Sequence, residues 1–170
     1  MFKHILALLV ACVLLAAPAQ ALAVRTGIVD VEKVMNASAA AKAANEHLAK
    51  VQAILQKGFS DLEKRVENAK KEERERELEA GRRVLERQMQ IELQAARAVV
   101  SQHMLESVRE WRKTKGGVVL AKAQVLDYSP KFDITDTVIA SMDKTPVQFN
   151  ALPVVSFKDK EAEKEKGGKK

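Results

Sequence analysis

The longest pattern in the chain is helical. From Ala39 to Lys115 the sequence holds no proline and only two glycines, Gly58 and Gly81. In the first half of this stretch, apolar residues recur in steps of four and three, which is typical of one face of a left-handed coiled coil. The seam predicted from this repeat consists of Leu48, Gln52, Leu55, Phe59, Leu62, Val66 and Ala69.

The second half of the stretch has a different period. Apolar residues eleven positions apart form two sets, Leu78, Met89, Val100 and Trp111 in one and Leu93 and Met104 in the other. An eleven-residue period favours a straight or right-handed helix. Two unlike periods predict a hairpin with two arms, each of about 35 to 40 residues and about 55 Å. Apolar side chains are scarce near 68–77, which we expect to be the exposed tip. One continuous helix is the alternative.

Short β-branched runs flank the helical stretch. Arg25–Val31 predicts a strand, and the pattern becomes helical around Glu32–Asn36, where Ser38 can cap the helix that follows. Because strands occur on both sides of the hairpin, we expect its two ends to meet in one small sheet.

The residues after the hairpin predict two more strands and a helix. Gly116-Gly117 ends the long helix, and Val118–Ala121 and Val125–Tyr128 then predict short strands. A last helix should begin at Asp133, which acts as its cap. Its apolar face would consist of Ile134, Val138, Ile139 and Met142.

These elements predict an α+β fold that is mainly α, a long antiparallel coiled-coil hairpin rooted in a small β-sheet body. The expected segments are a signal peptide (1–23), a β-rich oligomerisation body with the last helix (24–37 and 116–144), a hairpin arm (38–115) and a disordered Lys/Glu-rich tail (145–170). Within the tail, the run Val147–Phe157 is more apolar, and the alternative to disorder is that it docks as an added strand.

The first residues indicate export. Basic Lys3 and His4 precede an uncharged apolar run from Ile5 to Ala17, and small residues typical of cleavage sites follow. The run is shorter than the roughly 20 residues that a membrane-spanning helix needs. A lipoprotein site at Cys12 is a weaker alternative, because further apolar residues rather than a polar spacer follow it.

Composition narrows the possible partners. The net charge of +6 favours acidic partners such as anionic lipid or acidic protein, and export argues against nucleic acid. A basic cluster of Arg112, Lys113 and Lys115 is the candidate site for lipopolysaccharide or anionic lipid. Aromatic residues make up only 4% of the chain, so a thick core is not expected.

No catalytic constellation is evident. The mature chain would have no cysteine and only two histidines, His47 and His103, so we expect no enzyme activity and no cofactor. His103, Glu106 and Glu110 share one helix face, but exposed residues of this kind on a charged helix are usually solvated. We therefore expect no metal site.

The order of elements and two sequence runs resemble a known family. Gly27-Ile28-Val29-Asp30-Val31 and the run from Val118 to Ile139 are similar to the Skp/OmpH family of periplasmic chaperones, over residues 25–144. The ending of that family is very similar to Lys131–Ile139. The resemblance implies a periplasmic homotrimer, with three sheets joined in a barrel-like body and tentacle-like arms around a cavity. A small sheet with little core of its own is an independent reason to expect oligomerisation.

The resemblance also implies an ATP-independent holdase that keeps unfolded outer-membrane proteins from aggregating. The alternative is an exported coiled-coil adaptor or structural protein that binds one folded partner or the envelope surface. Candidate client-binding residues are Val51, Ile54, Val84, Met89, Ile91, Val99 and Met104. The oligomerisation body is predicted to use Ile28, Val29, Val31, Val118, Val119, Leu120, Val125, Leu126 and Tyr128.

Overall fold

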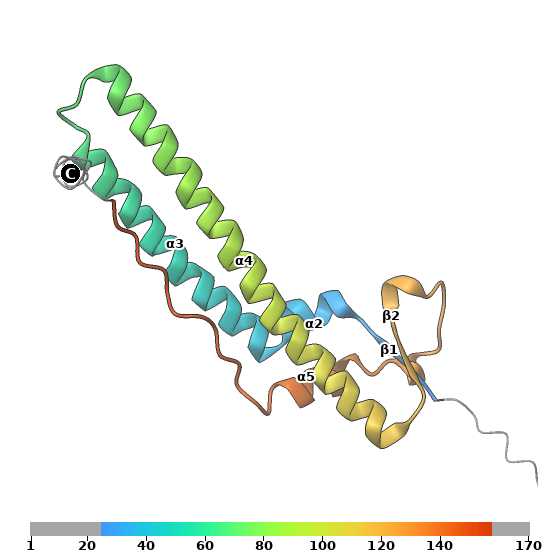
Figure 1. The fold of residues 1–170 in the computed structure, drawn as a ribbon. Coiled ribbons are helices and arrows are strands. Elements are labelled where there is room, and N and C mark those ends of the chain that lie inside the picture. Colours follow the sequence, from blue (N-terminus) through green and yellow to red (C-terminus); the bar gives the residue numbers. More distant parts are fainter. Residues whose placement is uncertain (1–24, 158–170) are drawn as a thin grey trace, which may run out of the picture.

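Two long antiparallel helices form the hairpin, α3 (Ala39–Arg65) and α4 (Lys71–Lys115) (Figure 1). The computed structural model describes residues 25–157, so the predicted signal peptide lies outside the described residues. Ser38 begins α3 as expected, because its Oγ accepts a hydrogen bond of 3.2 Å from the backbone N–H of Ala41. Such a cap satisfies one of the amide groups that a helix start leaves unpaired.

The tip is shorter than the sequence predicted. Residues 66–70 connect the two helices, and 71–77 already belong to α4, so arms of 27 and 45 residues replace the two similar arms expected. The scarcity of apolar residues at 68–77 was misleading, because the Lys, Glu and Arg found there are good helix formers. Val66 is 5% exposed and closes the end of the hairpin.

The seam of α3 has the predicted period but a different phase. Its buried residues are Ala44, Val51, Leu55, Gly58 and Leu62. Leu55 and Leu62 are therefore seam residues, whereas the predicted Gln52 is exposed and Phe59 is half-buried at the edge. The residues that alternate with the leucines come three positions after each leucine rather than four.

The eleven-residue period of α4 is visible in its buried face. Leu85, Ala96 and Ser107 are eleven apart, as are Gly81 and Glu92, and all five are buried. Of the predicted set, Val100 and Met104 are buried, while Leu78, Met89, Leu93 and Trp111 are half-buried. At Gly81 the missing side chain leaves room for Leu62 of α3.

The two ends of the hairpin meet in a parallel two-stranded sheet, as expected. β1 (Thr26–Val29) pairs with β2 (Val118–Ala121), with Thr26 opposite Val118 and Val29 opposite Ala121. On the other side of β1, Ile28 forms an isolated bridge with Asp133. β1 is thus flanked on both sides, whereas no described strand pairs with the outer edge of β2.

Short elements complete the root. α2 (Val31–Ala37) follows β1, and α5 (Thr135–Met142) closes the body after the 3₁₀ turns Lys122–Gln124 and Pro130–Phe132. The predicted strand at 125–128 is wrong, because these residues form an irregular loop after the first turn. The helix α5 begins two residues later than predicted, with Ile134 and not Asp133 at the N-cap position, although Asp133 Oδ1 accepts a hydrogen bond of 2.9 Å from the Thr135 N–H.

Two small apolar clusters take the place of a thick core. The root cluster joins Val29, Val34, Val100, Val138 and Met142, and Trp111 packs against it. A second cluster of Val51, Leu55 and Leu85 lies further along the hairpin.

Candidate binding surfaces

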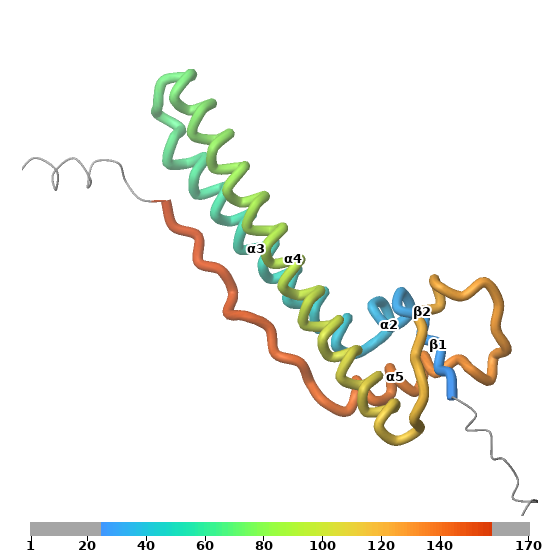
Figure 2. The backbone as a smooth tube through the Cα atoms, turned by 45° about the vertical axis from the view of Figure 1, so that its right-hand side comes forward, coloured from blue at the N-terminus to red at the C-terminus, as the bar shows by residue number. Residues whose placement is uncertain are grey.

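Residues 145–157, here called the strap, run extended along the hairpin toward its tip (Figures 1 and 2). The predicted disorder is therefore wrong for this part of the tail, and so is the alternative of an added strand, because the strap has no strand partner among the described residues. Residues 158–170 lie outside the described residues. Five strap residues are half-buried at alternate positions: Val147, Phe149, Pro153, Val155 and Phe157. Ala151 is exposed and interrupts the series.

The strap touches the hairpin through these half-buried side chains. The Phe149 ring stacks on the His47 imidazole of α3, with ring centroids 5.1 Å apart and planes inclined by 22°. Val155 packs against the second apolar cluster, directly over Gly58. At the end of the strap, the Arg65 guanidinium lies 5.8 Å from the centre of the Phe157 ring. The strap thus contacts α3 at His47, Gly58 and Arg65, and this surface of α3 is here called the strap groove.

Three clefts follow the hairpin. One of about 850 Å³ separates the start of the strap from α4, and one of about 520 Å³ lies between the end of the strap and α4. The third, of about 340 Å³, opens between the helices on another side and is lined by Leu55, Phe59, Leu85 and Met89. The Arg82 guanidinium lies 5.7 Å from the centre of the Phe59 ring and covers part of it.

The structure divides the predicted client-binding residues into accessible and buried ones. Val51 and Met104 are 0% and 9% exposed and hold the helices together, so their assignment to client contact is wrong for this conformation. Val84 and Ile91 are 63% and 52% exposed on α4. Val84 and Val99 line the two clefts beside the strap, and Met89 lines the third. Ile54 is half-buried, and its helical spacing places it on the face of α3 that carries Gly58.

Sequence reasoning gave docking of Val147–Phe157 only as an alternative, and as an added strand, so it did not predict the strap along the hairpin. The signal was the alternation of apolar residues over 147–157, which continues directly into a run of Lys and Glu. The charged run made the whole segment look like a solvated tail. Which surface an extended segment covers depends on tertiary contacts that a local pattern does not contain.

The predicted oligomerisation residues gather at the sheet, but they are not equivalent. Ile28 and Val29 are buried within the chain, and Val119, Val125 and Tyr128 are half-buried. Four others are exposed, namely Val31, Val118, Leu120 and Leu126. Leu126 is fully exposed in the loop after β2. An unpaired strand edge beside exposed apolar side chains is a surface that proteins normally cover.

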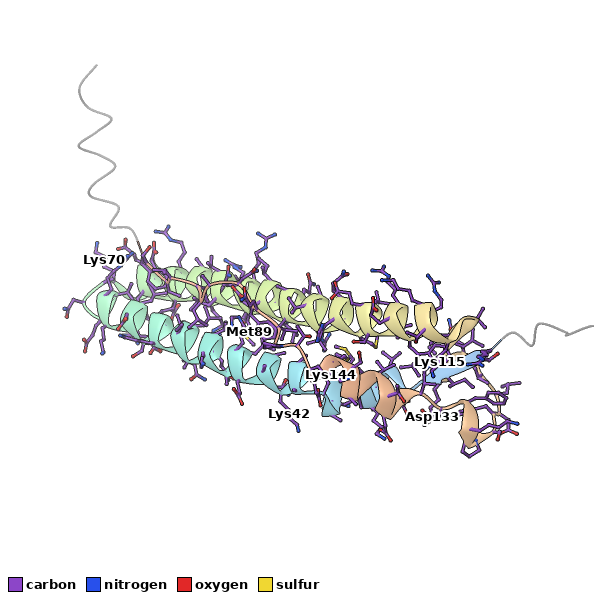
Figure 3. The ribbon with its side chains drawn as sticks, turned by 90° about the horizontal axis from the view of Figure 1, so that it is seen from below. Lys42, Lys70, Met89, Lys115, Asp133 and Lys144 are labelled. Atoms are coloured by element: carbon purple, nitrogen blue, oxygen red, sulfur yellow. The ribbon has the colours of Figure 1, made fainter. Side chains whose placement is uncertain are left out.

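The basic cluster lies at the opposite end of the hairpin from the tip (Figure 3, Lys115 and Lys70). Arg112, Lys113 and Lys115 are all exposed in the last turn of α4. The Lys113 Nζ donates a hydrogen bond of 2.7 Å to Glu110 Oε1. The charge that this cluster offers to an acidic partner is therefore partly offset within the helix itself.

Asp30 ties the sheet to both short helices. Its Oδ2 accepts a hydrogen bond of 2.7 Å from Lys122 Nζ, and its Oδ1 accepts one of 3.0 Å from the Lys33 N–H. The Asp30 N–H donates to Thr135 Oγ1 at 2.9 Å. The hydrogen bond from Lys122, followed by that from Lys33, holds the pKa of Asp30 below its usual value. Hydrogen bonds from Thr135 likewise lower the pKa of Asp133.

We expect this network to make the root sensitive to acid but not to moderate alkali. Asp30 and Asp133 have lowered pKa values in the folded chain. Their contribution to the stability of the fold is therefore complete above the pKa of the unfolded chain, about 4, and is lost as the pH falls through the lower pKa values of the folded chain. The pKa values of Lys33 and Lys122 are raised by Asp136 and Asp30, so their contribution persists until the pH exceeds about 10. Urea midpoints at pH 7 and pH 3 measure the effect. Asp30→Asn should reduce the difference between the urea midpoints at pH 7 and pH 3. An equal reduction by Asp127→Asn would contradict the role given to Asp30.

The residues considered as metal ligands in the sequence, His103 and Glu110 among them, have partners within the chain. His103 Nε2 lies 2.9 Å from the Met142 carbonyl oxygen, and Glu110 is paired with Lys113. Within residues 25–157, no group of three metal-binding side chains comes together. Over the same residues, no helix has the length and apolar character needed to cross a bilayer.

Comparison with known proteins places the fold in a family. Residues 25–142, which include the sheet, the hairpin and α5, match the model of the family described as outer membrane protein (OmpH-like). A search of curated proteins gave no match. Among solved structures, a candidate outer membrane chaperone (OmpH-like) from Caulobacter crescentus is 18% identical, with a TM-score of 0.45, and the alignment covers 76% of this chain and 91% of that chain. The family match spans well over half of the sequence and agrees with the resemblance carried by its first and last elements. The chain therefore belongs to the OmpH-like outer membrane protein family.

Proposed function

We propose that the protein is an ATP-independent holdase chaperone of the periplasm, which binds unfolded outer-membrane proteins and keeps them from aggregating. The observation that carries this proposal is the accessible apolar surface along a charged arm. The cleft beside Phe59 and Met89 is open to solvent, and Val84 and Ile91 are more than half exposed. Such a surface offers many weak apolar contacts without a shaped pocket for one ligand, which suits varied unfolded chains.

Membership of the OmpH-like family supports the same function. The named Caulobacter crescentus protein is described as a candidate outer membrane chaperone, and we extend that role to this chain as part of the proposal. Charge would assist capture, because the net charge of +6, which becomes +5 when the predicted signal peptide takes Lys3 with it, attracts acidic segments at long range. Binding should therefore weaken as salt is added.

The proposal includes a homotrimer whose arms surround the bound chain. Its support within the molecule is the outer edge of β2, where backbone groups lack a described strand partner beside exposed Val118 and Leu120. Leu126 projects from the adjoining loop. Association through these edges would pair the backbone groups and remove the apolar side chains from water. A single two-stranded sheet is at best marginally stable, which gives the same expectation.

Aggregation of an unfolded porin tests the function. The purified mature protein should sediment at three times the mass of one chain, and one trimer per porin should suppress the light scattering of porin diluted from urea. Leu120→Asp places a charge at the edge of β2 and should reduce the mass to that of one chain and abolish suppression, because the cavity between the arms is lost. Ala123→Asp, an exposed change in the neighbouring turn, is the matched control.

Two outcomes would overturn the proposal. Porin that aggregates equally fast with stoichiometric wild-type protein would contradict the holdase, and a wild-type mass of one or two chains would contradict the trimer. Tight binding of one folded envelope protein, with no effect on porin, would favour the adaptor alternative.

A further inference from the structure

The strap is held by side chains and not by its backbone. Over the described residues, the last backbone hydrogen bond toward the C-terminus is donated by the Thr145 N–H to the Met142 carbonyl. From 146 to 157 the described contacts are made by side chains: Val147 and Phe149 pack against the root cluster, Phe149 also stacks on His47, Val155 lies over Gly58, and Phe157 lies beside Arg65. Any extended segment with apolar side chains at the same spacing can make contacts of this kind, because successive side chains of an extended chain point to opposite sides.

Gly58 indicates that the groove is shaped for such a segment. A Cβ atom at position 58 would lie 2.5 Å from Val155 Cγ1, and the three nearest heavy atoms to it all belong to Val155. A glycine inside a helix costs roughly 1 kcal/mol relative to alanine. The atoms nearest to this position belong to Val155 of the strap, and this close approach gives a reason for a glycine here. The glycine therefore makes room for an apolar side chain that lies on the hairpin.

The strap fills its groove incompletely. The clefts of about 850 and 520 Å³ separate it from α4 near its two ends. Val154 is 91% exposed and Leu152 39% exposed, so two apolar side chains also lie on the outward side of the strap, between polar Asn150 and Ser156. A segment with few contacts, no backbone pairing and unfilled space beside it is held weakly enough to be displaced.

We propose that the strap groove, from His47 through Gly58 to Arg65, binds extended polypeptide segments with apolar residues at alternate positions, and that the strap is its intramolecular occupant. Strands of outer-membrane barrels have this alternation, with apolar residues facing lipid and polar residues facing the lumen. The inference rests on the proposed function for the identity of its ligand, because it assigns to that function a binding site and a class of segment. The strap then competes with the client and covers the groove when no client is present.

The energetic consequence follows from the tether. A covalently attached segment has an effective concentration of order millimolar, so an external segment must first overcome that competition. Its apparent affinity is reduced in proportion to the fraction of molecules with a vacant groove. Releasing the strap should therefore strengthen the binding of an external segment without any change in the groove.

Binding of a peptide with the strap's own sequence, Pro-Val-Gln-Phe-Asn-Ala-Leu-Pro-Val-Val-Ser-Phe, tests the inference. With fluorescein-labelled peptide and full-length mature protein, the variant Phe149→Asp/Val155→Asp should bind at least about tenfold more tightly than wild type. The matched control Asn150→Asp/Val154→Asp adds the same charges to the exposed side of the strap and should bind as weakly as wild type. A peptide of the same composition with its apolar residues grouped at one end should bind weakly to every variant.

A change in the groove itself provides the second arm. Adding Gly58→Ala to the released-strap variant should remove the tenfold gain, since the new Cβ occupies the space of the apolar side chain. Alanine favours the helix, so this variant should fold, and Lys57→Ala on the exposed side is its control. Equal peptide affinity in wild type and released-strap protein, or a gain that survives Gly58→Ala, would overturn the inference.

Porin aggregation measured with the same proteins separates the two proposals. If all variants suppress aggregation, and neither the strap substitutions nor Gly58→Ala changes peptide affinity, the holdase proposal stands and the proposed binding site in the groove is rejected. Peptide binding that follows the pattern above, with no suppression of aggregation, would keep the groove and remove the holdase.

Discussion

Replacing Gly117 with alanine is expected to unfold the root of the hairpin. Gly117 has a φ of +88°, and a Cβ at this position would overlap the backbone of Arg25. The Val118 N–H donates a hydrogen bond of 2.9 Å to the Arg25 carbonyl at this same point, immediately before β1 and β2 begin to pair. Because backbone atoms cannot rotate out of the way as a side chain can, the substitution must separate the two strands. We expect the free energy of unfolding to fall by about 4 kcal/mol, from backbone strain and atomic overlap together.

Gly116 provides the matched control for this substitution. It also has a positive φ, +71°, with a ψ of −179°, but a Cβ added at this position would have no neighbouring atom within 4 Å. Alanine there should cost about 2 kcal/mol for the strained backbone alone. Urea denaturation at one fixed protein concentration measures both changes, and hydrogen exchange of the β2 amides locates them. Equal losses of stability for Gly116→Ala and Gly117→Ala would show that the overlap with Arg25 does not contribute.

Replacing Leu62 with alanine is expected to loosen the distal half of the hairpin. Leu62 is 1% exposed, and its side chain lies against Gly81 of α4, where an added Cβ would overlap Leu62 Cδ2. Removing a buried leucine costs about 3 kcal/mol, from lost burial and from the cavity left behind. Gly81→Ala alone should cost about 1 kcal/mol, because the overlap forces Leu62 aside while alanine favours the helix.

The double variant tests whether these two positions share one space. In Leu62→Ala/Gly81→Ala the new methyl group enters the cavity, so the combined loss should be smaller than the sum of the single losses by about 1 kcal/mol or more. Urea denaturation of all four proteins completes the cycle. Gln52→Ala, exposed on the same helix, should change stability by no more than about 0.5 kcal/mol. Strictly additive losses at 62 and 81 would refute the contact.

The sequence predicted the period of the hairpin better than its phase. Leucines seven residues apart at 48, 55 and 62 identify one row of the seam, but the second row can follow each leucine by three residues or by four. Polar Gln52 argued against the choice of four, while Val51 and Gly58 fit the choice of three. Gly58 does not count as apolar in a search for periodicity. Its role depends on Val155, almost a hundred residues later in the chain.

The same distinction between local and distant information applies to the binding surfaces. Val84 and Ile91 are exposed, as expected for apolar residues that lie beside the seam and not in it, and their contact with a client stays a prediction. Val51 was misassigned with the phase of the seam, and Met104 belongs to the root cluster. The loop at 125–128 has β-forming residues, yet no neighbouring strand among the described residues supplies the hydrogen bonds that a strand requires.

The parallel pairing at the root also determines the order in which the molecule can fold. Asp30 and Lys122 are hydrogen-bonded although they are 92 residues apart in the chain, and the paired residues of β1 and β2 have a similar separation in sequence. Closing so long a loop is entropically costly unless the hairpin between the strands has formed first and brought its ends together. Helices form within microseconds, so α3 and α4 should assemble early and the sheet last. In the export to the periplasm that we propose, with the N-terminus leading, β1 would stay unpaired until almost the whole body has crossed the membrane.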